Sequence, residues 1–193
     1  VLIVKNEADN LKACLASLDG LVDEIVILDS GSQDETPAIA AEFGARFFVN
    51  TVWPGFGRQR RLAQSHVQSE WVLWLDADER LTPELKEAIA TVMANPASDT
   101  IYSIPRLSWV FGRFIRHSGW YPDRVLRLYP KALTRYNEVL VHEKVEVRAN
   151  MKIVNIHGDL LHFTYRDLEH YLVKSAGYAK AWADQRTARG KKG

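Results

Sequence analysis

Short apolar runs alternate with amphipathic segments through the first half of this sequence, and few folds accommodate that order. The runs are rich in β-branched and aromatic residues and cover 1–4, 25–28, 47–49 and 71–75. Between them, apolar residues recur at helical spacing, and short polar loops join the segments. Such an order is typical of βαβ units, which form a parallel sheet covered by helices on both faces. We therefore expect an α/β domain.

Capping residues indicate where several of the helices begin and end. Asp9 or Asn10 is the expected N-cap of the first helix. Thr36 and Thr82 are each followed by proline, which predicts a threonine N-cap with proline at the first helical position. The helix that follows Thr36 is expected to end near Gly44, because glycine often terminates a helix.

The second half of the chain differs in character from the first. Strand-like runs follow one another without intervening helices at 101–104, 124–129, 139–147 and 152–163. This order suggests a mixed or antiparallel extension of the sheet. From residue 166 the apolar spacing becomes helical again, and the chain ends in a polar tail. No repeat, low-complexity tract or change of composition marks a second core, so we expect a single domain over 1–193.

Charge, cysteine content and hydropathy exclude several classes of protein. The formal net charge is +1 over 193 residues, so no overall field attracts the molecule to nucleic acid, and we expect no nucleic-acid partner. The single cysteine, Cys14, cannot form an internal disulfide, which fits a cytoplasmic setting. No apolar stretch approaches the roughly 18 residues of a membrane span, so the chain is not expected to cross a bilayer by itself.

The strongest chemical signal is the segment Asp76-Ala77-Asp78, directly after the apolar run 71–75. Residues two apart in an extended chain face the same way, so both carboxylates can converge on one point. Together with phosphate oxygens and water they suit a hard divalent cation, Mg2+ or Mn2+. The alternative is that Asp78 and Glu79 only cap the next helix and solubilise a turn. The place of the pair at the carboxyl end of a strand favours the metal site.

Asp29 stands at the matching end of another expected strand. Ligands of open α/β sheets bind beyond the carboxyl ends of the strands, so Asp29 should line one cleft with Asp76 and Asp78. With a cation on Asp76 and Asp78, this acidic cleft can accept a phosphate, while Asp29 accepts N–H donors from a base ring. The alternative is that Asp29 only forms a turn, with its side chain bonded to residues 30–32.

Four ordered segments resemble those of inverting family-2 glycosyltransferases, which have the GT-A fold. They are VKNE at 4–7, LDSGSQDET at 28–36, GFGRQRRLA at 55–63 and WLDADERL at 74–81. Later segments, GWYPDRVLRLYP, VHEKV and LLHFTYRDLEHYL, are more narrowly similar to the lipopolysaccharide core β-glucosyltransferases that extend heptose. The resemblance covers nearly the whole chain. It implies a mainly parallel central sheet flanked by helices, with a small mixed or antiparallel extension.

The resemblance also implies residues for a nucleotide-sugar site. It puts Asn6, Glu7 and Asp29 around the nucleoside, with Asp29 on the base. Arg60 matches the basic residue that the family has in the helix before the metal motif, where it can pair with donor phosphate or ribose. The nucleotide-sugar donor would therefore be bound by residues 1–100, the acceptor by 101–165, and residues 166–193 would form a C-terminal helix and tail.

A set of metal ligands follows from the same resemblance. Asp78 would be the principal ligand, and Asp76 would contact the ribose or reach the ion through water. Many enzymes of this fold add a late histidine, and LLHFTY matches its place with His162. Imidazole suits Mn2+ better than Mg2+, so ligation by His162 would favour manganese. The alternative is a buried, hydrogen-bonded core histidine.

Sugar transfer to a hydroxyl also needs a base, normally a carboxylate within hydrogen-bond reach of the acceptor. Glu143 in VHEKV is the first candidate, because it matches the acidic pair that carries the base in related transferases. That pair here is His-Glu in place of the usual Glu-Asp. Asp123 is the second candidate. For either residue the alternative is a structural salt bridge to a neighbouring arginine.

A basic and aromatic segment spans 106–135 and contains seven Lys and Arg residues against one acid. Basic residues with exposed aromatics suit a phosphorylated glycolipid at a membrane surface, which is what the resemblance implies. Single-stranded nucleic acid would use the same residue types, and several of the aromatics could instead be core. We expect an acceptor loop here, in a cytoplasmic protein with peripheral contact to the inner face of the membrane.

The expected function is transfer of a hexose, glucose from UDP-glucose, to a sugar of a cell-envelope glycolipid such as the lipopolysaccharide inner core. The donor base and sugar rest on the resemblance alone. One rival is a metal-dependent phosphatase with Asp76 as nucleophile, although Arg80 stands where the phosphoaspartate motif has Thr or Val. A glycoside hydrolase would also use two carboxylates. The other rival is a non-catalytic nucleotide- or glycolipid-binding module.

Overall fold

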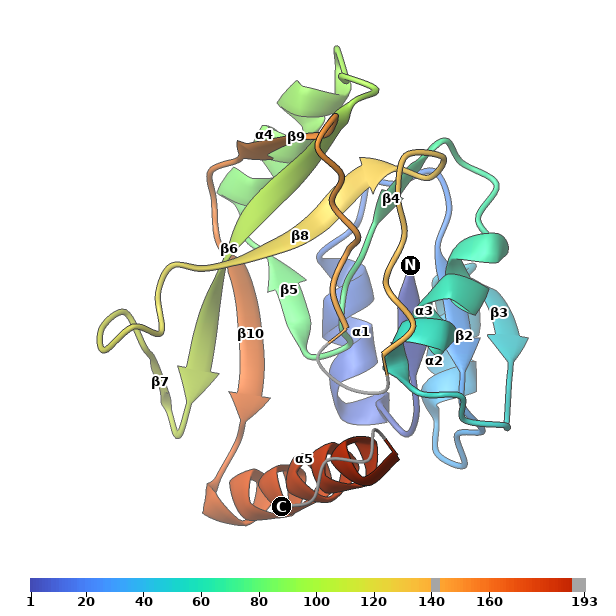
Figure 1. Ribbon diagram of the computed structural model, residues 1–193, viewed down its shortest axis with the longest axis vertical. Coiled ribbons are helices and arrows are strands. Elements are labelled where there is room, and N and C mark those ends of the chain that lie inside the picture. Colours follow the sequence, from blue (N-terminus) through green and yellow to red (C-terminus); the bar gives the residue numbers. More distant parts are fainter. Residues whose placement is uncertain (140–142, 189–193) are drawn as a thin grey trace.

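The computed structural model describes residues 1–139 and 143–188, and its ribbon is shown in Figure 1. Within these residues the helices are α1 (Ala8–Ala16), α2 (Thr36–Glu42), α3 (Phe56–Ser65), α4 (Pro83–Met93) and α5 (Leu168–Ala188). The strands are β1 (Leu2–Val4), β2 (Val26–Asp29), β3 (Arg46–Val49), β4 (Trp71–Leu73), β5 (Glu79–Leu81), β6 (Thr100–Val110), β7 (Arg113–Phe114), β8 (Asp123–Pro130), β9 (Lys152–Asn155) and β10 (Leu160–Tyr165).

The strands form a parallel sheet and a mixed sheet that meet at β4. The parallel sheet has the order β1-β2-β3, and the mixed sheet has the order β4-β8-β6-β10-β5 with β7 and β9 also paired to β6. Backbone N–H of Leu75, just after β4, donates to the carbonyl oxygen of Val1 at 3.1 Å, so β4 runs beside β1. Figure 1 shows the parallel strands on the right and the long strands of the mixed sheet on the left.

Alternate strand residues point to opposite faces of the sheet and pack into two buried clusters. One cluster packs against α1 and α4 and includes Leu2, Ile27, Leu11, Leu15 and Leu85. The other packs against α3 and includes Val26, Leu28, Trp74, Tyr129 and Ala63. In the second cluster, Trp74 Nε1 donates to the Tyr129 hydroxyl at 2.7 Å, so the buried indole N–H is satisfied. The acidic segment that follows Trp74 therefore extends from a rigid base.

The helix caps agree with the sequence only in part. Thr82 caps α4 as expected, because its hydroxyl accepts from Leu85 N at 3.3 Å. Thr36 lies inside α2, and its hydroxyl accepts from the backbone N–H of Glu7 at 2.8 Å. The first helix begins at Ala8 with Glu7 at the N-cap, two positions before Asp9 and three before Asn10, the two expected caps. Contacts between the two loops that follow β1 and β2 therefore decide both of these helix starts.

Two strands of the first half differ from the expectation. The run 71–75 was expected in the parallel sheet, but β4 pairs antiparallel with β8, through Leu73 opposite Leu128. The sequence also predicts no strand at β5, where Glu79 pairs with His162 of β10. Glu79 is fully buried and does not cap the next helix. The antiparallel pairing of β4 and the existence of β5 both depend on strands that are distant in the sequence, so local periodicity does not predict them.

The second half confirms the mixed extension but corrects two of its strands. The run 139–147 contains only an isolated bridge of Val145 to Tyr136, with residues 140–142 outside the described part. The run 152–163 divides into β9 and β10 around a turn at Gly158. A side chain at Gly158 would meet the backbone of Leu85 at 2.3 Å, so this turn packs directly on α4.

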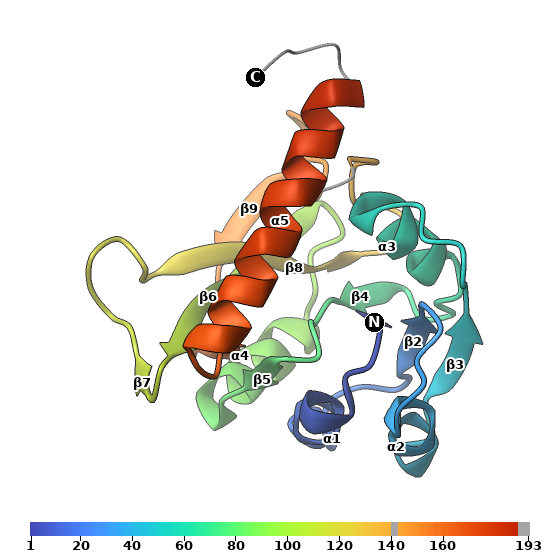
Figure 2. The ribbon, with the colours of Figure 1, turned by 90° about the horizontal axis from the view of Figure 1, so that it is seen from below.

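Helix α5 follows β10 and forms the lower edge of the molecule in Figure 1. In Figure 2, seen from below, α5 lies in front of the other elements. Several of its apolar side chains are exposed, including Leu168, Leu172 and Trp182. Over the described residues, no helix has both the length and the apolar character that a membrane span requires.

Candidate active site

A hollow of about 1220 Å3 opens where the carboxyl ends of β1 and β4 approach β8 and β10. Six of the residues singled out in the sequence line it, namely Glu7, Arg60, Asp76, Asp78, Glu143 and His162. They come from segments that are up to 155 positions apart in the chain, between Glu7 and His162. The fold therefore brings the acidic segment, the arginine helix, the VHEKV segment and the late histidine into one site.

Asp76 is held by two buried arginines. Arg60 Nη2 donates to its Oδ1 at 2.6 Å, and Arg127 Nη2 donates to its Oδ2 at 2.6 Å. Burial alone would raise the pKa of the Asp76 carboxyl, but Arg127 and Arg60 together hold that pKa well below its usual range. Asp76 is therefore a carboxylate whose charge the protein already compensates, which makes it a poor direct metal ligand in this arrangement.

Arg127 and Glu79 complete the cluster around Asp76 and were not singled out from the sequence. Arg127 Nη2 also donates to Glu79 Oε1 at 2.8 Å, and Glu79 Oε2 accepts from the backbone N–H of Asp76 at 2.9 Å. The carboxylate of Glu79 thus holds the backbone of the acidic segment at Asp76. One signal was available for Arg127, because it interrupts the apolar strand between Leu126 and Leu128.

Arg60 connects Asp76 to the candidate base. Its Nε donates to Glu143 Oε1 at 2.8 Å, and its guanidinium lies 4.9 Å from the ring centre of Tyr136. The Glu143 side chain is 13% exposed and faces the hollow. Glu143 therefore forms a salt bridge with an arginine, as the alternative expected, and its carboxylate also lies in the site, as a base would. The salt bridge orients Glu143, because the guanidinium that holds it is itself fixed by Asp76.

Close contact between α3 and the segment before Glu143 explains the second glycine of GFGRQRRLA. Gly57 N donates to the carbonyl oxygen of Val139 at 3.2 Å. A Cβ at Gly57 would lie 2.0 Å from the carbonyl oxygen of Asn137, a distance no side chain can occupy. Arg61 on the next turn reinforces the contact, with Nη1 2.7 Å from Glu138 Oε1. The start of α3 therefore sets the path of the chain towards Glu143.

Asp78 and His162 form a second group of residues that line the hollow. His162 Nε2 lies 3.4 Å from Asp78 Oδ2, and Lys174 Nζ of α5 lies 3.2 Å from the same oxygen. Burial opposes ionisation of Asp78, but His162 and Lys174 beside it lower the pKa of the carboxyl. No sequence pattern indicated Lys174, which lies 96 positions from Asp78.

The residues of this second group fit a divalent cation. Two ligand atoms about 2.1 Å from one octahedral ion lie roughly 3 Å apart, close to the separation of Asp78 and His162. His162 Nε2 is the ring nitrogen that faces Asp78, while Nδ1 is buried without a hydrogen-bond partner among the described residues. The described residues contain no group of three or more metal-ligating side chains. Such a cation would thus need further ligands from a substrate, as Mg2+ commonly has.

Glu7 adds a third acid to the hollow, next to the loop that follows β1. Burial raises the pKa of its carboxyl, and Asp78 adds to the rise, while a 3.1 Å hydrogen bond from Asn10 opposes it. With Glu143 included, four carboxylates therefore face the hollow, and among the described residues arginines bond Asp76 and Glu143 but neither Glu7 nor Asp78.

Asn6 and Asp29 lie beside the hollow but do not line it. Asp29 is 2% exposed, and its Oδ2 accepts from the backbone N–H groups of Gly31 and Ser32, each at 2.7 Å. Asn6 Oδ1 accepts from the backbone N–H of Gln33 at 2.9 Å. Both side chains thus shape the turn after β2, and the structure does not place Asp29 among the residues that line the hollow with Asp76 and Asp78. The turn-forming alternative for Asp29 is the one observed.

Asp123 is also absent from the hollow. Its Oδ2 accepts from Arg106 Nε at 2.9 Å, and its side chain is 42% exposed. This is the salt bridge considered as the alternative for Asp123. Arg106 also lies 3.6 Å from Glu79, so it links Asp123 to the outer edge of the charged cluster.

The basic and aromatic segment supplies one wall of the hollow and an exposed hairpin. Trp120 and Arg124 line the hollow, while Phe111 and Phe114 are exposed around β7. Arg116 stacks on the ring of Tyr121 at 5.2 Å. Part of this segment therefore lies at the site, and part offers aromatic side chains to the solvent.

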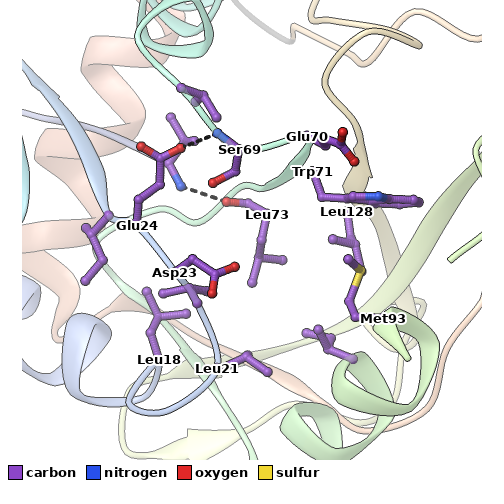
Figure 3. A pocket seen from close by; sticks show the side chains of 15 residues that line it. Leu18, Leu21, Asp23, Glu24, Ser69, Glu70, Trp71, Leu73, Met93 and Leu128 are labelled. Carbon is purple, nitrogen blue, oxygen red and sulfur yellow. Dashed lines mark hydrogen bonds between the residues drawn. The ribbon is translucent and has the colours of Figure 1, made fainter. Parts of the chain in front are cut away.

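Figure 3 shows a separate cavity of about 370 Å3 near the amino end of β1. Its walls are mainly apolar, with Leu18, Leu21 and Met93 pointing into it. Glu24 at its rim accepts from the backbone N–H of Ser69 at 2.7 Å. Burial opposes ionisation of Glu24, yet the backbone N–H of Ser69 and the other bonds to the carboxylate lower its pKa to about 2. This cavity lacks the clustered cationic groups that bind phosphates.

Comparison with known proteins identifies the family. The sequence profile of Glycosyl transferase family 2 matches residues 1–150, more than half of the chain. The chain belongs to glycosyl transferase family 2. The match covers the acidic segment, Arg60 and Glu143, so the residues of the hollow are largely those of the family domain.

Relatives with curated names agree with this assignment. The chain is 32% identical over 204 residues to the "Lipopolysaccharide core biosynthesis glycosyltransferase LpsC" of Rhizobium meliloti, covering 99% of this chain and 72% of the relative. It is 27% identical over 205 residues to an "Uncharacterized glycosyltransferase" of Rickettsia felis, covering 99% of this chain and 70% of the relative.

Solved structures of GT-A glycosyltransferases share the fold of this chain. S. aureus TarS aligns with a TM-score of 0.54 at 18% identity, covering 86% of this chain and 36% of TarS. A TarS 1–349 structure in complex with UDP aligns with a TM-score of 0.53 at 18% identity, covering 89% of this chain and 61% of that one. This chain thus spans only about a third of TarS. At this identity the likeness shows the fold, and it confirms the expected GT-A architecture.

Proposed function

We propose that this chain is the catalytic domain of an inverting glycosyltransferase that moves a hexose, glucose from UDP-glucose, to a sugar of a cell-envelope glycolipid. The observation that carries the proposal is the single hollow shared by Glu143, Asp78 and His162. The name of the Rhizobium meliloti relative supports an acceptor in the lipopolysaccharide core. Family membership supports the transferase class.

Glu143 is the proposed base. It accepts the proton of the acceptor hydroxyl as that oxygen forms a bond to the anomeric carbon of the donor sugar. The bond from this carbon to the diphosphate oxygen breaks at the same time, and the nucleoside diphosphate leaves with the electron pair. Attack from the face opposite the leaving group inverts the configuration. Arg60 orients Glu143 through the 2.8 Å bond to its carboxylate.

Asp78 and His162 are the proposed cation ligands. A divalent cation held there would neutralise the negative charge that develops on the leaving diphosphate. The imidazole of His162 favours Mn2+ over Mg2+. Asp76 takes a different role from the one expected, since both of its oxygens are bonded to arginines. We assign it to holding Arg60 and Arg127 in place beside the donor.

Residues 101–165 are the proposed acceptor half, and the β6–β7 hairpin is the part that reaches the glycolipid. Phe111, Phe114 and Arg113 are exposed there, which suits an interface between apolar chains and charged head groups. The protein would then act at the inner face of the cytoplasmic membrane without spanning it. Asn6 and Asp29 are proposed to support the nucleoside indirectly, through the turn that they stabilise.

The decisive experiment measures nucleotide release from a panel of sugar nucleotides with a truncated glycolipid acceptor, in Mn2+, in Mg2+ and in chelator. We expect release from UDP-glucose that depends on the cation and on the acceptor. Asp78→Asn should abolish it, while Lys12→Gln on the exposed side of α1 should leave it unchanged. Activity that survives chelation would overturn the cation site.

The same assay separates the rival functions. Release of inorganic phosphate from phosphate esters without a sugar nucleotide would indicate a phosphatase. The two arginines on Asp76 disfavour that reaction, because each oxygen of the carboxylate is already bonded to a guanidinium and is less available to attack phosphorus. Binding of UDP-glucose without turnover by any acceptor would indicate a binding module.

A further inference from the structure

Lys174 of α5 places an ammonium group beside the acid proposed to bind the cation. Its Nζ lies 3.2 Å from Asp78 Oδ2 and 3.4 Å from the carbonyl oxygen of Thr164. The same Asp78 oxygen lies 3.4 Å from His162 Nε2. Lys174 and His162 thus approach one carboxylate oxygen, and Lys174 stands within the space that a cation on Asp78 and His162 would enter.

The charges around the hollow explain why an ammonium is stable there. Asp76 is balanced by Arg60 and Arg127, and Glu143 is bonded to Arg60, but the remaining two carboxylates of the hollow, Glu7 and Asp78, have no bond to either arginine among the described residues. Uncompensated charges in a partly buried site are costly, so a counter-ion is needed when no cation is bound. Lys174, with a side chain 28% exposed, supplies it.

From these contacts we propose that Lys174 occupies the cation position of Asp78 in the nucleotide-free protein and transfers to the diphosphate when donor and cation bind. This inference rests on the proposed function. An ammonium and a divalent cation on the same carboxylate oxygen repel each other at close range, so cation binding weakens the contact of Lys174 with Asp78. The diphosphate of the donor offers Lys174 an anionic partner instead, because phosphate oxygens accept readily from ammonium groups.

The position of α5 makes this exchange possible. Tyr171 and Ser175, on the same side of the helix as Lys174, also line the hollow. The lysine stem is long and flexible, so its Nζ can move by several ångströms while α5 stays in place. Lys174 would thereby make the cation and the nucleotide bind cooperatively, and by linkage each would strengthen the other by the same factor.

The test measures Mn2+ binding, from the electron paramagnetic resonance signal of free Mn2+, in wild type and Lys174→Gln, without and with UDP. We expect the variant to bind Mn2+ about tenfold more tightly than wild type when UDP is absent. We also expect UDP to improve Mn2+ binding by a smaller factor in the variant. Lys174→Arg keeps the positive charge and should behave like wild type, and Lys12→Gln is the control for loss of a surface lysine.

Each result bears on the inference. Equal Mn2+ affinities in wild type and Lys174→Gln, in both conditions, would overturn the role of Lys174 and leave the cation site intact. Weaker Mn2+ binding by the variant without UDP would also overturn it. No Mn2+ binding by any protein, even with UDP, would overturn this inference and the proposed cation site together. If Lys174→Gln does not fold, Lys174→Met gives the same comparison with an apolar stem of similar length.

Discussion

Arg127 Nη2 lies 2.6 Å from Asp76 Oδ2, so the first acid of the D-A-D segment is bound from strand β8 before any ligand arrives. The same nitrogen lies 2.8 Å from Glu79. One guanidinium thus ties the loop after β4 to β5 and β8. The two acids of the segment differ in their surroundings as a result, with Asp76 held by arginines and Asp78 facing His162 and Lys174.

Replacing Arg127 with methionine should destabilise the protein by about 3 kcal/mol, because it leaves the buried carboxylate of Glu79 and the half-buried carboxylate of Asp76 partly uncompensated. The measurement is the free energy of unfolding in urea. Lys152→Met removes an exposed ion pair with Asp99 and should change that free energy by no more than about 0.5 kcal/mol. Equal effects of the two substitutions would show that the buried cluster adds no special stability.

The depressed pKa of Asp76 predicts a specific dependence of stability on pH. A carboxyl whose folded pKa is below its unfolded value of about 3.9 stabilises the fold above that value, and this contribution is lost as the pH falls towards the folded pKa. Asp76→Asn should therefore be less stable than wild type by a constant amount above about pH 5, and the difference should shrink below about pH 4. The measurement is the thermal unfolding of both proteins at a series of pH values from about 7 down to about 2. A difference that stays constant down to pH 2 would contradict it.

Local signals in the sequence predicted the helices and strands best where neighbours in the chain decide the structure. Thr82 caps α4 through its own turn, and this expectation is confirmed. Thr36 has the same local sequence, but its hydroxyl accepts a hydrogen bond from Glu7, 29 positions away. The run 139–147 has alternating apolar residues, yet its described residues, 139 and 143–147, form only an isolated bridge at Val145 and a contact of Val139 with Gly57 of α3. Tertiary contacts override propensity in both of these places.

The sequence predicted those residues of the site that lie in recognisable segments. Asp78, Arg60, Glu143 and His162 follow from recognisable segments, and the fold gathers them in one hollow. Arg127 bonds to Asp76, 51 positions away, and Lys174 bonds to Asp78, 96 positions away. Local spacing in the sequence cannot predict such pairs. Asp29 and Asp123 carry the right chemistry at expected positions, but nearby donors already bind their carboxylates.

Gly57→Ala tests whether the start of α3 positions Glu143. The new methyl group would overlap the carbonyl oxygen of Asn137, so the segment leading to Glu143 must move, at a cost of about 1–3 kcal/mol. We expect lower stability and a fall in kcat. Gly177→Ala is the matched control, because a Cβ there meets no atom within 4 Å and alanine favours a helix. Its stability should be unchanged or slightly higher. Similar behaviour of the two variants would contradict the positioning role.

Glu143→Gln separates proton transfer from donor binding. Glutamine keeps an oxygen that can accept from Arg60 Nε, so the local geometry is largely retained, but an amide cannot take up the acceptor proton. We expect kcat to fall by about 10²- to 10⁴-fold, the usual contribution of a general base, with the affinity for UDP within about threefold of wild type. Asp123→Asn is the comparison, because Asp123 does not line the hollow and its carboxylate is already bonded to Arg106, so this variant should retain most of the activity. The measurements are single-turnover kinetics and UDP titration for both variants. A large loss of kcat in Asp123→Asn with normal turnover in Glu143→Gln would assign the base to Asp123 and show that Glu143 serves only as the partner of Arg60.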